Sequence, residues 1–376
     1  MKILFITHDT TRTGAPMVLL HFLRWLKEHQ SQVEIDVLAL RGGNMEEEFQ
    51  ENCSNYYNYS VETKTVSLSI IQRILKKLHL YKQKNKKDVF IASLAKNGYD
   101  VIYANTVVAI PIGVSISKAS RESKLFAHIH ELQVVIRQLL PDFKKFLPEI
   151  DAIIVPSEIV KNNLVNSWGV NKENLLVVHA FTEVVKIKPV KQKAKSKQKF
   201  VVGASGMVHW RKGFDLFLLV ARNIDLRYPD ADILFQWVGK LPKNISHIID
   251  EDIRKLNLQE SVNFIGEVSN PKTYFNDFDI FLMTSREDPF PLVCIEVGLL
   301  GKPIISFEQA TGTNEVILKG GGFVVPYLDI EAMANRVMEY YNSANLVEEH
   351  GAINIREFSN FIPEEICPKL YAMLIN

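Results

Sequence analysis

Short runs of apolar residues alternate along the chain with longer segments whose apolar positions recur every three to four residues. The short runs have the length of buried strands, and the longer segments have the period of amphipathic helices. This alternation is typical of βαβ units stacked around parallel sheets. The predicted strands are 2–7, 34–40, 101–104, 124–129 and 152–155 in the first half, and 200–203, 233–238, 262–265, 280–283 and 303–305 in the second.

Helix signals stand between these strands. The segment from Pro16 to Glu28 has proline in its first turn and leucines on one face, and Ser157 is placed to cap a helix that reaches Val165. The longest uncharged run, 101–117, is interrupted by proline and glycine and is shorter than the ~20 apolar residues of a spanning helix. It therefore predicts a buried strand, a loop and a helix start. Further helices are predicted over 215–228, 292–300 and 364–374.

A change of composition divides the chain, which at 376 residues is too long for one hydrophobic core. Residues 189–199 read P-V-K-Q-K-A-K-S-K-Q-K, the composition of a linker, and the strand and helix pattern restarts after them. We therefore predict an α/β protein with two Rossmann-like domains facing across a cleft. The predicted parts are a first domain over 1–188, the linker 189–199, a second domain over 200–360, and a C-terminal helix within 361–376 that could cross back to the first domain.

The charge balance excludes binding through the overall field of the molecule. Net charge is +1, with 47% hydrophobic and 23% charged residues, so affinity for nucleic acid or membrane must come from local patches, and we expect no nucleic acid partner. One basic stretch runs from Arg73 to Lys87, with isoleucines and leucines between its lysines. It predicts a basic amphipathic helix, which suits either an anionic membrane surface or a solvated helix face over an apolar core.

The cysteines indicate a reducing compartment. Cys53, Cys294 and Cys367 are odd in number, far apart and without a C-x-x-C pair, which favours neither a disulfide framework nor a zinc site. The first apolar run ends at His8 and Asp9, too early for the apolar core of a signal peptide. We therefore expect a cytoplasmic protein, which the basic stretch could place at the inner face of a membrane.

The segment 285–298, S-R-E-D-P-F-P-L-V-C-I-E-V-G, carries the strongest chemical signal. It follows a buried strand and places a loop with two prolines before a helix that begins at about Pro291 or Leu292. The N–H groups at such a helix start, with the positive end of its dipole, suit a phosphate. Glu296, one turn into the helix, could accept both hydroxyls of a ribose, and Asp288 lies in the loop near where an attached sugar would be.

The spacing of Asp288 and Glu296 resembles the E-x7-E motif of the retaining glycosyltransferases of family 4, which have the GT-B fold. That motif reads approximately S-x-x-E-G-F-G-L-V-x-L-E-A, and Phe290, Leu292, Val293 and Glu296 fall on its positions. Two features depart from it: Asp288 is one methylene shorter than the first glutamate, and prolines replace both glycines. The resemblance implies catalytic roles for Asp288 and Glu296 and donor contacts for Phe290, Pro291, Leu292 and Glu296.

A second match lies at the start of the second half. The segment 203–213, G-A-S-G-M-V-H-W-R-K-G, resembles the family's G-R-L-x-x-x-K-G, whose arginine and lysine bind the donor diphosphate. Lys212 matches the lysine, whereas Met207 stands where the arginine is expected, and the adjacent Arg211 would have to supply the charge. Fixed cations suit a leaving diphosphate, because its negative charge grows as the glycosidic bond breaks. The alternative is a surface pair of basic residues before a helix.

Two further matches lie in the first half. The loop 10–16 resembles the family's glycine-bearing loop, in which Gly14 would let the backbone approach the donor phosphate and sugar. The segment 126–131, F-A-H-I-H-E, resembles the strand end whose histidine faces the sugar. His130, followed by an acidic residue, is the predicted histidine and has a catalytic role by the resemblance; His128 is the fallback.

Other motifs point away from metals and cofactors. Asp277-Phe278-Asp279 is a D-x-D string, the metal-binding signature of the other large glycosyltransferase fold. Because Asp279 opens a buried strand and no other cluster of metal ligands accompanies it, we expect no catalytic metal. Dinucleotide and P-loop signatures are absent from the sequence. We expect no cofactor, since a nucleotide sugar is a co-substrate.

The resemblance implies a metal-independent, hexosyltransferase-type enzyme that moves a sugar from a UDP- or GDP-sugar to a glycan or lipid-linked hydroxyl acceptor. The second domain would bind the donor and the first would face the acceptor, in cell-surface polysaccharide or glycolipid synthesis. One alternative is a sugar-nucleotide epimerase, but only His130 stands out as its acid–base residue. Another is a catalytically silent glycan- or nucleotide-binding protein, which Met207 and Asp288 favour.

Overall fold

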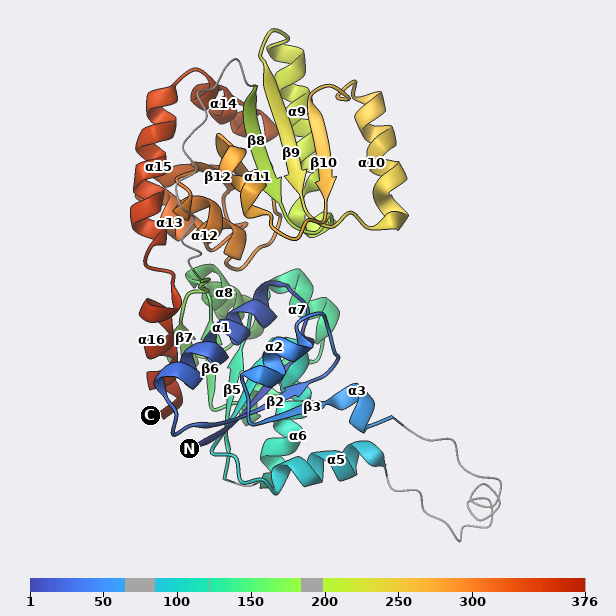
Figure 1. Cartoon of the computed structure of the whole chain (residues 1–376), viewed down its shortest axis with the longest axis vertical. Helices are drawn as coiled ribbons and strands as arrows, with labels where there is room; N and C mark the ends of the chain where they lie inside the picture. The colour runs from blue at the N-terminus through green and yellow to red at the C-terminus, as the bar shows by residue number, and fades with distance from the viewer. Residues whose placement is uncertain (65–84, 121, 184–198, 376) are drawn as a thin grey trace, which may run out of the picture. The chain divides into compact units, whose positions relative to one another are not determined.

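The computed structural model describes residues 1–64, 85–120, 122–183 and 199–375. They form two compact units, each an α/β unit around one parallel sheet (Figure 1). Unit 1 contains Met1–Val155, Val160–Val178 and the C-terminal residues from Cys367 on, and unit 2 contains Pro156–Ile159 and His179–Ile366. The predicted α/β class with two Rossmann-like parts is confirmed. Residues 156–159 and 179–183, which the sequence placed in the first domain, belong to unit 2, and the C-terminal residues from Cys367 on belong to unit 1, the domain to which the last helix was predicted to cross back.

Unit 1 is built on a seven-stranded parallel sheet in the order β3-β2-β1-β4-β5-β6-β7. Its central strand β1 is buried over Ile3–Ile6, as expected for a strand covered on both faces. The strands are β1 (Lys2–Thr7), β2 (Glu34–Ala39), β3 (Asn55–Asn58), β4 (Val101–Asn105), β5 (Lys124–His128), β6 (Ala152–Val155) and β7 (Leu175–Val177).

The helices of unit 1 follow the predicted amphipathic pattern. In α1 the leucines of the predicted apolar face are at most 2% exposed, and the uncharged run 101–117 becomes β4, a short 3₁₀ turn and the start of α6. The helices are α1 (Gly14–His29), α2 (Glu46–Glu51), α3 (Tyr59–Glu62), α5 (Lys86–Ala95), α6 (Ile110–Ser120) and α7 (Gln133–Leu139), joined by α8 (Glu158–Asn163) from Val160 on and by the later part of α16 (Pro363–Ile375).

Unit 2 has a six-stranded parallel sheet in the order β10-β9-β8-β11-β12-β13. Its core contains Phe217 of α9 packed edge-on against Phe235 and Trp237 of β9. The strands are β8 (Phe200–Ser205), β9 (Ile233–Val238), β10 (Val262–Gly266), β11 (Ile280–Met283), β12 (Ile304–Phe307) and β13 (Gly322–Val325), and the helices are α9 (Phe214–Arg227), α10 (Lys243–Lys255), α11 (Lys272–Asp277), α12 (Leu292–Leu299), α13 (Asn314–Val316), α14 (Ile330–Tyr341) and α15 (Ala344–Phe358).

Strand order reverses once in each sheet, and this positions the loops that carry chemistry. In unit 2 the reversal lies between β8 and β11, and in unit 1 it lies between β1 and β4. Loops that leave neighbouring strands in opposite directions separate at such a point and leave room for a ligand. The segments after β8 and β11 contain Lys212 and Asp288, and those after β1 and β4 contain Gly14 and Thr106.

Several expectations fall outside the described residues or need correction. The linker lies almost wholly outside them, and so does the basic stretch except for its last residues, of which Lys86 and Lys87 open α5. Ser157 precedes α8 as predicted, but its hydroxyl donates to the carbonyl oxygen of Pro289 at 2.8 Å. In the part of the chain that the structure describes, no helix has both the length and the apolarity to span a membrane.

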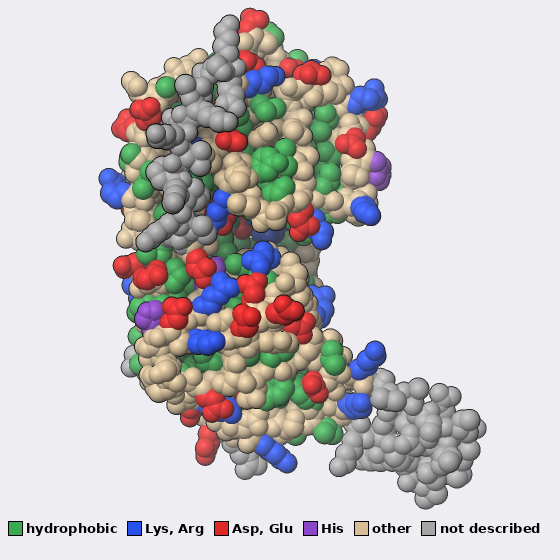
Figure 2. Space-filling view, viewed as in Figure 1, with side chains coloured by type: hydrophobic (Ala, Val, Ile, Leu, Met, Phe, Trp, Pro, Cys, Tyr) green, Lys and Arg blue, Asp and Glu red, His purple; other side chains and the backbone are tan. Residues whose placement is uncertain are grey.

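The surface carries charges of both signs. Figure 2 shows lysine and arginine side chains interspersed with aspartate and glutamate on the face that it presents. This agrees with the net charge of +1 and with the expectation that polyanion binding would need a local patch.

Candidate functional site

Two loops of unit 2 bring the predicted diphosphate residues together at the ends of β8 and β11. The first loop closes with a 3₁₀ turn, Trp210–Lys212, and the second follows Met283. The backbone N–H of Arg286 donates to the carbonyl of Arg211 at 2.8 Å, and the hydroxyl of Thr284 donates to the carbonyl of Lys212 at 3.1 Å. Hydrogen bonds to backbone carbonyls therefore hold together residues that lie more than 70 positions apart in sequence.

Gly213 makes this close approach of the two loops possible. It adopts φ +70°, a left-handed conformation that favours glycine. A Cβ at this position would lie 2.0 Å from the carbonyl oxygen of Thr284. Gly213, which follows Arg211 and Lys212, thus allows the first loop to pack against the segment directly after β11.

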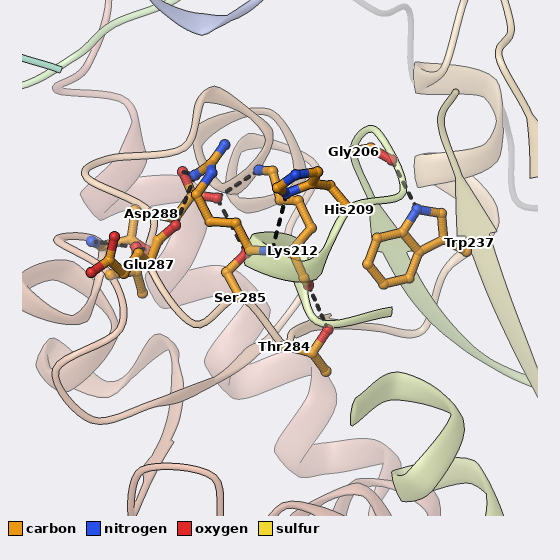
Figure 3. A network of polar contacts seen from close by, with 11 residues as sticks. Gly206, His209, Lys212, Trp237, Thr284, Ser285, Glu287 and Asp288 are labelled. Carbon is orange, nitrogen blue, oxygen red and sulfur yellow. Dashed lines mark hydrogen bonds and ion pairs between the residues drawn. The ribbon is translucent and has the colours of Figure 1, made fainter. Parts of the chain in front are cut away.

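A buried carboxylate lies at the centre of the site and pairs with both predicted cations (Figure 3). Lys212 Nζ is 2.6 Å from Asp288 Oδ2, and Arg211 Nη1 is 3.4 Å from Asp288 Oδ1. Ser285 Oγ donates to Asp288 Oδ2 at 3.2 Å. The Asp288 side chain is 8% exposed and that of Lys212 15%. The three predicted site residues therefore lie together, and Asp288 forms an ion pair with Lys212 in this structure.

The ionisation of Asp288 follows from these neighbours. Burial by itself raises the pKa of Asp288, but the charges of Lys212 and Arg211 and the hydrogen bonds from Lys212 and Ser285 outweigh it and hold the pKa below its ordinary value. Met207, where the family has an arginine, is 52% exposed. Arg211 supplies the second positive charge beside Asp288, as its position next to Lys212 suggested.

Arg286 is a site residue that the sequence did not single out. Its guanidinium binds Asp215 through two nitrogens, at 2.9 Å and 2.7 Å, and donates to the carbonyl of Trp210 at 2.8 Å. It also lies over the indole ring of Trp210, 5.1 Å from the ring centroid. The second loop thereby holds the turn that carries Arg211 and Lys212.

If Arg211 and Lys212 bind a diphosphate, as the resemblance implies, Arg286→Ala should lower kcat/KM for a nucleotide-sugar donor by about 10-fold to 100-fold, because displacing a catalytic group by an ångström is costly. Arg286→Lys keeps the charge but cannot bind Asp215 through a planar fork, so it should lie between the alanine variant and wild type. Arg254→Ala is the matched control, since it removes a two-nitrogen pair with Glu251 within α10. Unchanged kcat/KM in Arg286→Ala would contradict a positioning role.

Helix α12 begins at Leu292 as predicted, and its N-cap, Pro291, makes no side-chain capping bond. Cys294 lies in the first turn of α12 and is buried. Burial is the main cause that raises the pKa of Cys294 to about 12, so the thiol stays protonated. Asp288, paired with two cations, therefore lies in the loop that leads to the N-terminus of α12.

The predicted donor contacts of the proline-rich loop differ in exposure. Phe290 is 5% exposed and packs against the rings of His179 and Phe361, with both centroids 5.2 Å away. Pro291 is also buried, whereas Leu292 is half-buried. Phe290 therefore packs inside unit 2, and its predicted contact with the donor stays a prediction.

Glu296 lies one turn into α12, as the motif predicted. Its side chain is 22% exposed, and its carboxylate is 3.9 Å from Lys272 Nζ at the start of α11. Burial raises the pKa of Glu296, and the charge of Lys272 opposes this. The carboxylate is thus half-buried and only loosely paired, which leaves it able to accept hydrogen bonds from a ligand.

The candidates in unit 1 occupy the ends of its central strands. Gly14 opens α1, and a Cβ added there would meet nothing within 4 Å. His130 follows β5, is half-buried, and has its ring 3.8 Å from that of His128. His128 is 1% exposed and bonded to the hydroxyl of Tyr103. Of the two histidines, only His130 has a surface that a ligand could reach.

The D-x-D string has a structural explanation. Asp277 ends α11, and Asp279 Oδ2 accepts the backbone N–H of Val201 at 2.8 Å. Within the described ranges, no three His, Cys, Asp or Glu side chains are grouped so that they could hold a metal ion. Asp279 thus joins β8 to the start of β11.

Two family models match the chain. The model described as "Glycosyl transferases group 1" matches residues 199–343, and the model described as "Glycosyltransferase Family 4" matches residues 12–184. The two matches divide the sequence in the way that the two sheets do. They include the loops that carry Lys212, Asp288, Gly14 and His130.

Curated relatives and a solved structure agree with the family models. An uncharacterised glycosyltransferase of Haemophilus influenzae is 26% identical over 42% of this chain and 44% of its own length. The capsular polysaccharide biosynthesis glycosyltransferase CapM of Staphylococcus aureus is 25% identical over 57% of this chain and 58% of its own. The chain thus spans about half the length of these relatives. Anabaena HepE, crystallised with UDP and glucose, is 19% identical with a TM-score of 0.78 over the whole of both chains, which shows a shared fold.

Proposed function

Because the chain belongs to the family 4 glycosyltransferases, we propose that it transfers a sugar from a UDP- or GDP-sugar to a hydroxyl acceptor. The observation that carries this proposal is a region of unit 2 in which Lys212 and Arg211 pair with one buried carboxylate in the loop before α12. Such a region suits an anion whose charge increases during reaction, as that of a leaving diphosphate does.

The candidate site residues of unit 2 have separate proposed roles in binding the donor. Lys212 and Arg211 bind the diphosphate together with the N–H groups at the start of α12. Glu296, which is half-buried and loosely paired, accepts hydrogen bonds from the two ribose hydroxyls. Asp288, which pairs with these cations, contacts the hydroxyls of the transferred sugar. Its shorter side chain suits a sugar that lies close to the loop.

Two residues of unit 1 also have proposed roles toward the donor. Gly14, beside which a Cβ would meet open space, lets the backbone of the first turn of α1 approach the donor. His130 contacts a hydroxyl of the transferred sugar. Burial and then the charge of His8 lower the pKa of His130 to about 3, so the ring is neutral near neutral pH and can accept a hydrogen bond.

We propose that transfer retains the anomeric configuration and needs no metal ion or cofactor. The leaving phosphate takes the proton of the acceptor hydroxyl on the same face of the sugar. The protein therefore need not supply the acid and base pair of carboxylates that a glycosidase uses. Lys212 and Arg211 stabilise the phosphate charge in the way that a bound metal ion does in other enzymes.

The acceptor is proposed to be a glycan or a lipid-linked sugar of cell-surface polysaccharide synthesis. The similarity to CapM, a capsular polysaccharide enzyme, supports this class. The HepE crystals with UDP and glucose support a hexose donor carried on UDP. Such an acceptor would place the enzyme on the cytoplasmic side of the inner membrane.

A donor panel tests the proposal. Thermal shifts with UDP-glucose, UDP-GlcNAc and GDP-mannose identify the donor, because a ligand that binds only the folded protein raises its melting temperature. Release of the nucleotide diphosphate is then measured with and without EDTA. We expect release to persist in EDTA and KM for the donor to rise about 10-fold to 100-fold in Glu296→Ala. Glu339→Ala, which removes a carboxylate paired with Arg336 in α14, is the matched control.

Three other outcomes would contradict the proposal. Conversion of the donor sugar without release of the nucleotide indicates an epimerase. Tight donor binding without turnover for any acceptor offered indicates a silent binding protein. Release that stops in EDTA and returns with Mg²⁺ contradicts metal independence.

A further inference from the structure

Asn105 connects the two residues of unit 1 that the proposed function uses. It ends β4, is fully buried, and lies in register between Thr7 of β1 and His128 of β5. Its Nδ2 donates to the carbonyl oxygen of Ala15 at 3.0 Å, and its Oδ1 lies 2.9 Å from Nε2 of His130. Ala15 follows Gly14 in the first turn of α1, so one side-chain amide joins that turn to the histidine ring.

The orientation of this amide determines where the His130 proton lies. Rotating the amide by half a turn would set Oδ1 against the carbonyl oxygen of Ala15, and two acceptors would then face each other. With Oδ1 toward His130, the ring nitrogen Nε2 must be the donor and must carry the proton. Since the ring is neutral near neutral pH, Nδ1 keeps its lone pair and is the hydrogen-bond acceptor that remains for a ligand.

The backbone on both sides of this contact is held in place. The Glu131 carboxylate accepts the N–H of His130 at 2.9 Å and that of Val107 at 3.3 Å, which joins the segments after β5 and β4. Thr106, directly after Asn105, adopts φ +89°, a conformation that a β-branched residue rarely takes. Its N–H donates to the carbonyl of His128 at 2.8 Å. Strained backbone of this kind is concentrated at functional sites.

We propose that Asn105 is a positioning residue that holds His130 in the Nε2–H tautomer and thereby presents Nδ1 as an acceptor to a hydroxyl of the transferred sugar. The Ala15 contact fixes the ring relative to the Gly14 turn, so that the two parts move together. The identity of the hydroxyl rests on the proposed function. The tautomer does not, since it follows from contacts within the ligand-free unit.

The tautomer is measured directly in the ligand-free full chain. In protein labelled with ¹⁵N-histidine, two-bond ¹⁵N–¹H correlations near neutral pH distinguish Nε2–H from Nδ1–H, and His130→Gln identifies the signals that belong to His130. We expect the Nε2–H pattern for wild type. An Nδ1–H pattern, or an interconverting mixture, overturns the inference even if the enzyme is active. A fixed Nε2–H ring in a protein that turns over no donor leaves the tautomer standing and contradicts the proposed function.

Variants of Asn105 separate positioning from folding. Asn105→Asp keeps an acceptor for Nε2–H but sets its second oxygen against the carbonyl of Ala15, so it should keep the proton on Nε2 and lose stability. Asn105→Ala should release the tautomer and lower kcat/KM for the donor by about tenfold. Asn354→Ala is the control, because Asn354 is a fully buried asparagine of unit 2 whose amide also holds two backbone carbonyls. It should reduce stability and leave the His130 tautomer unchanged. A wild-type kcat/KM in Asn105→Ala contradicts the positioning role, and if that variant does not fold, the wild-type and Asn105→Asp spectra decide.

Discussion

Replacing Lys212 by alanine is expected to lower kcat for sugar transfer by about 10²-fold to 10³-fold, the largest loss of activity for a single substitution here. The Lys212 side chain is 15% exposed, and its ammonium group lies 2.6 Å from one carboxylate oxygen, so its charge acts where water screens it little. Its effect on rate should exceed its effect on donor binding, because the leaving diphosphate carries more charge in the transition state than in the bound donor. The measurement is steady-state release of nucleotide diphosphate with the donor that the panel identifies.

Two comparisons make this prediction specific. Lys240→Ala removes an exposed lysine of the same unit whose partner Glu267 is 4.0 Å away, and it should leave kcat unchanged. Lys212→Arg keeps the charge but changes its shape and reach, so it should recover part of the rate. If Lys212→Ala raises KM and leaves kcat intact, the lysine binds the donor without stabilising the transition state, and the proposed role is wrong.

The sequence predicts most strands of both sheets, because these strands are short, mainly apolar runs between segments of helical period. β1, β6, β9 and β11 have the predicted bounds. β3 was not predicted, because its sequence N-Y-Y-N is polar and only half-buried at the sheet edge. β7 was not predicted either, since three residues after a 3₁₀ turn carry little pattern. Edge strands depend on their neighbour more than on their own composition.

The site is predictable only in part, since side-chain partners are set by tertiary contacts. Motif spacing alone suggested that Lys212 and Asp288 serve one ligand, but it did not indicate that they bind each other. Nothing local marks Arg286 as a partner of Asp215, 71 positions away. Asn105 looks from the sequence like an ordinary polar residue after a strand, and only the contacts with Ala15 and His130 give it a role. The motif assigns Phe290 to the donor, and only the structure shows that its ring packs against His179 and Phe361.

Asp288→Ala is expected to destabilise the protein by about 3–5 kcal/mol, because it leaves a buried ammonium group without its counter-ion. Asp288→Asn should cost less, since an amide oxygen can still accept from Lys212 and from Ser285. In the double variant Lys212→Met with Asp288→Leu the unpaired charge is gone, so most of the lost stability should return. Urea unfolding of the four proteins measures these differences, and a double variant no more stable than Asp288→Ala would show that the ion pair is not the cause.

The same variant also tests whether the diphosphate and the carboxylate share one set of cations. If the donor binds Lys212 and Arg211, UDP should raise the melting temperature of Asp288→Ala more than that of wild type, because the bound diphosphate replaces the missing negative charge. The gain should disappear in the double variant, which retains only Arg211 as a cation beside the former carboxylate position. Equal rises in melting temperature in wild type and Asp288→Ala would mean that the diphosphate does not replace the missing carboxylate. Lys212 would then have a structural role, because UDP would gain no extra affinity from the unpaired cation.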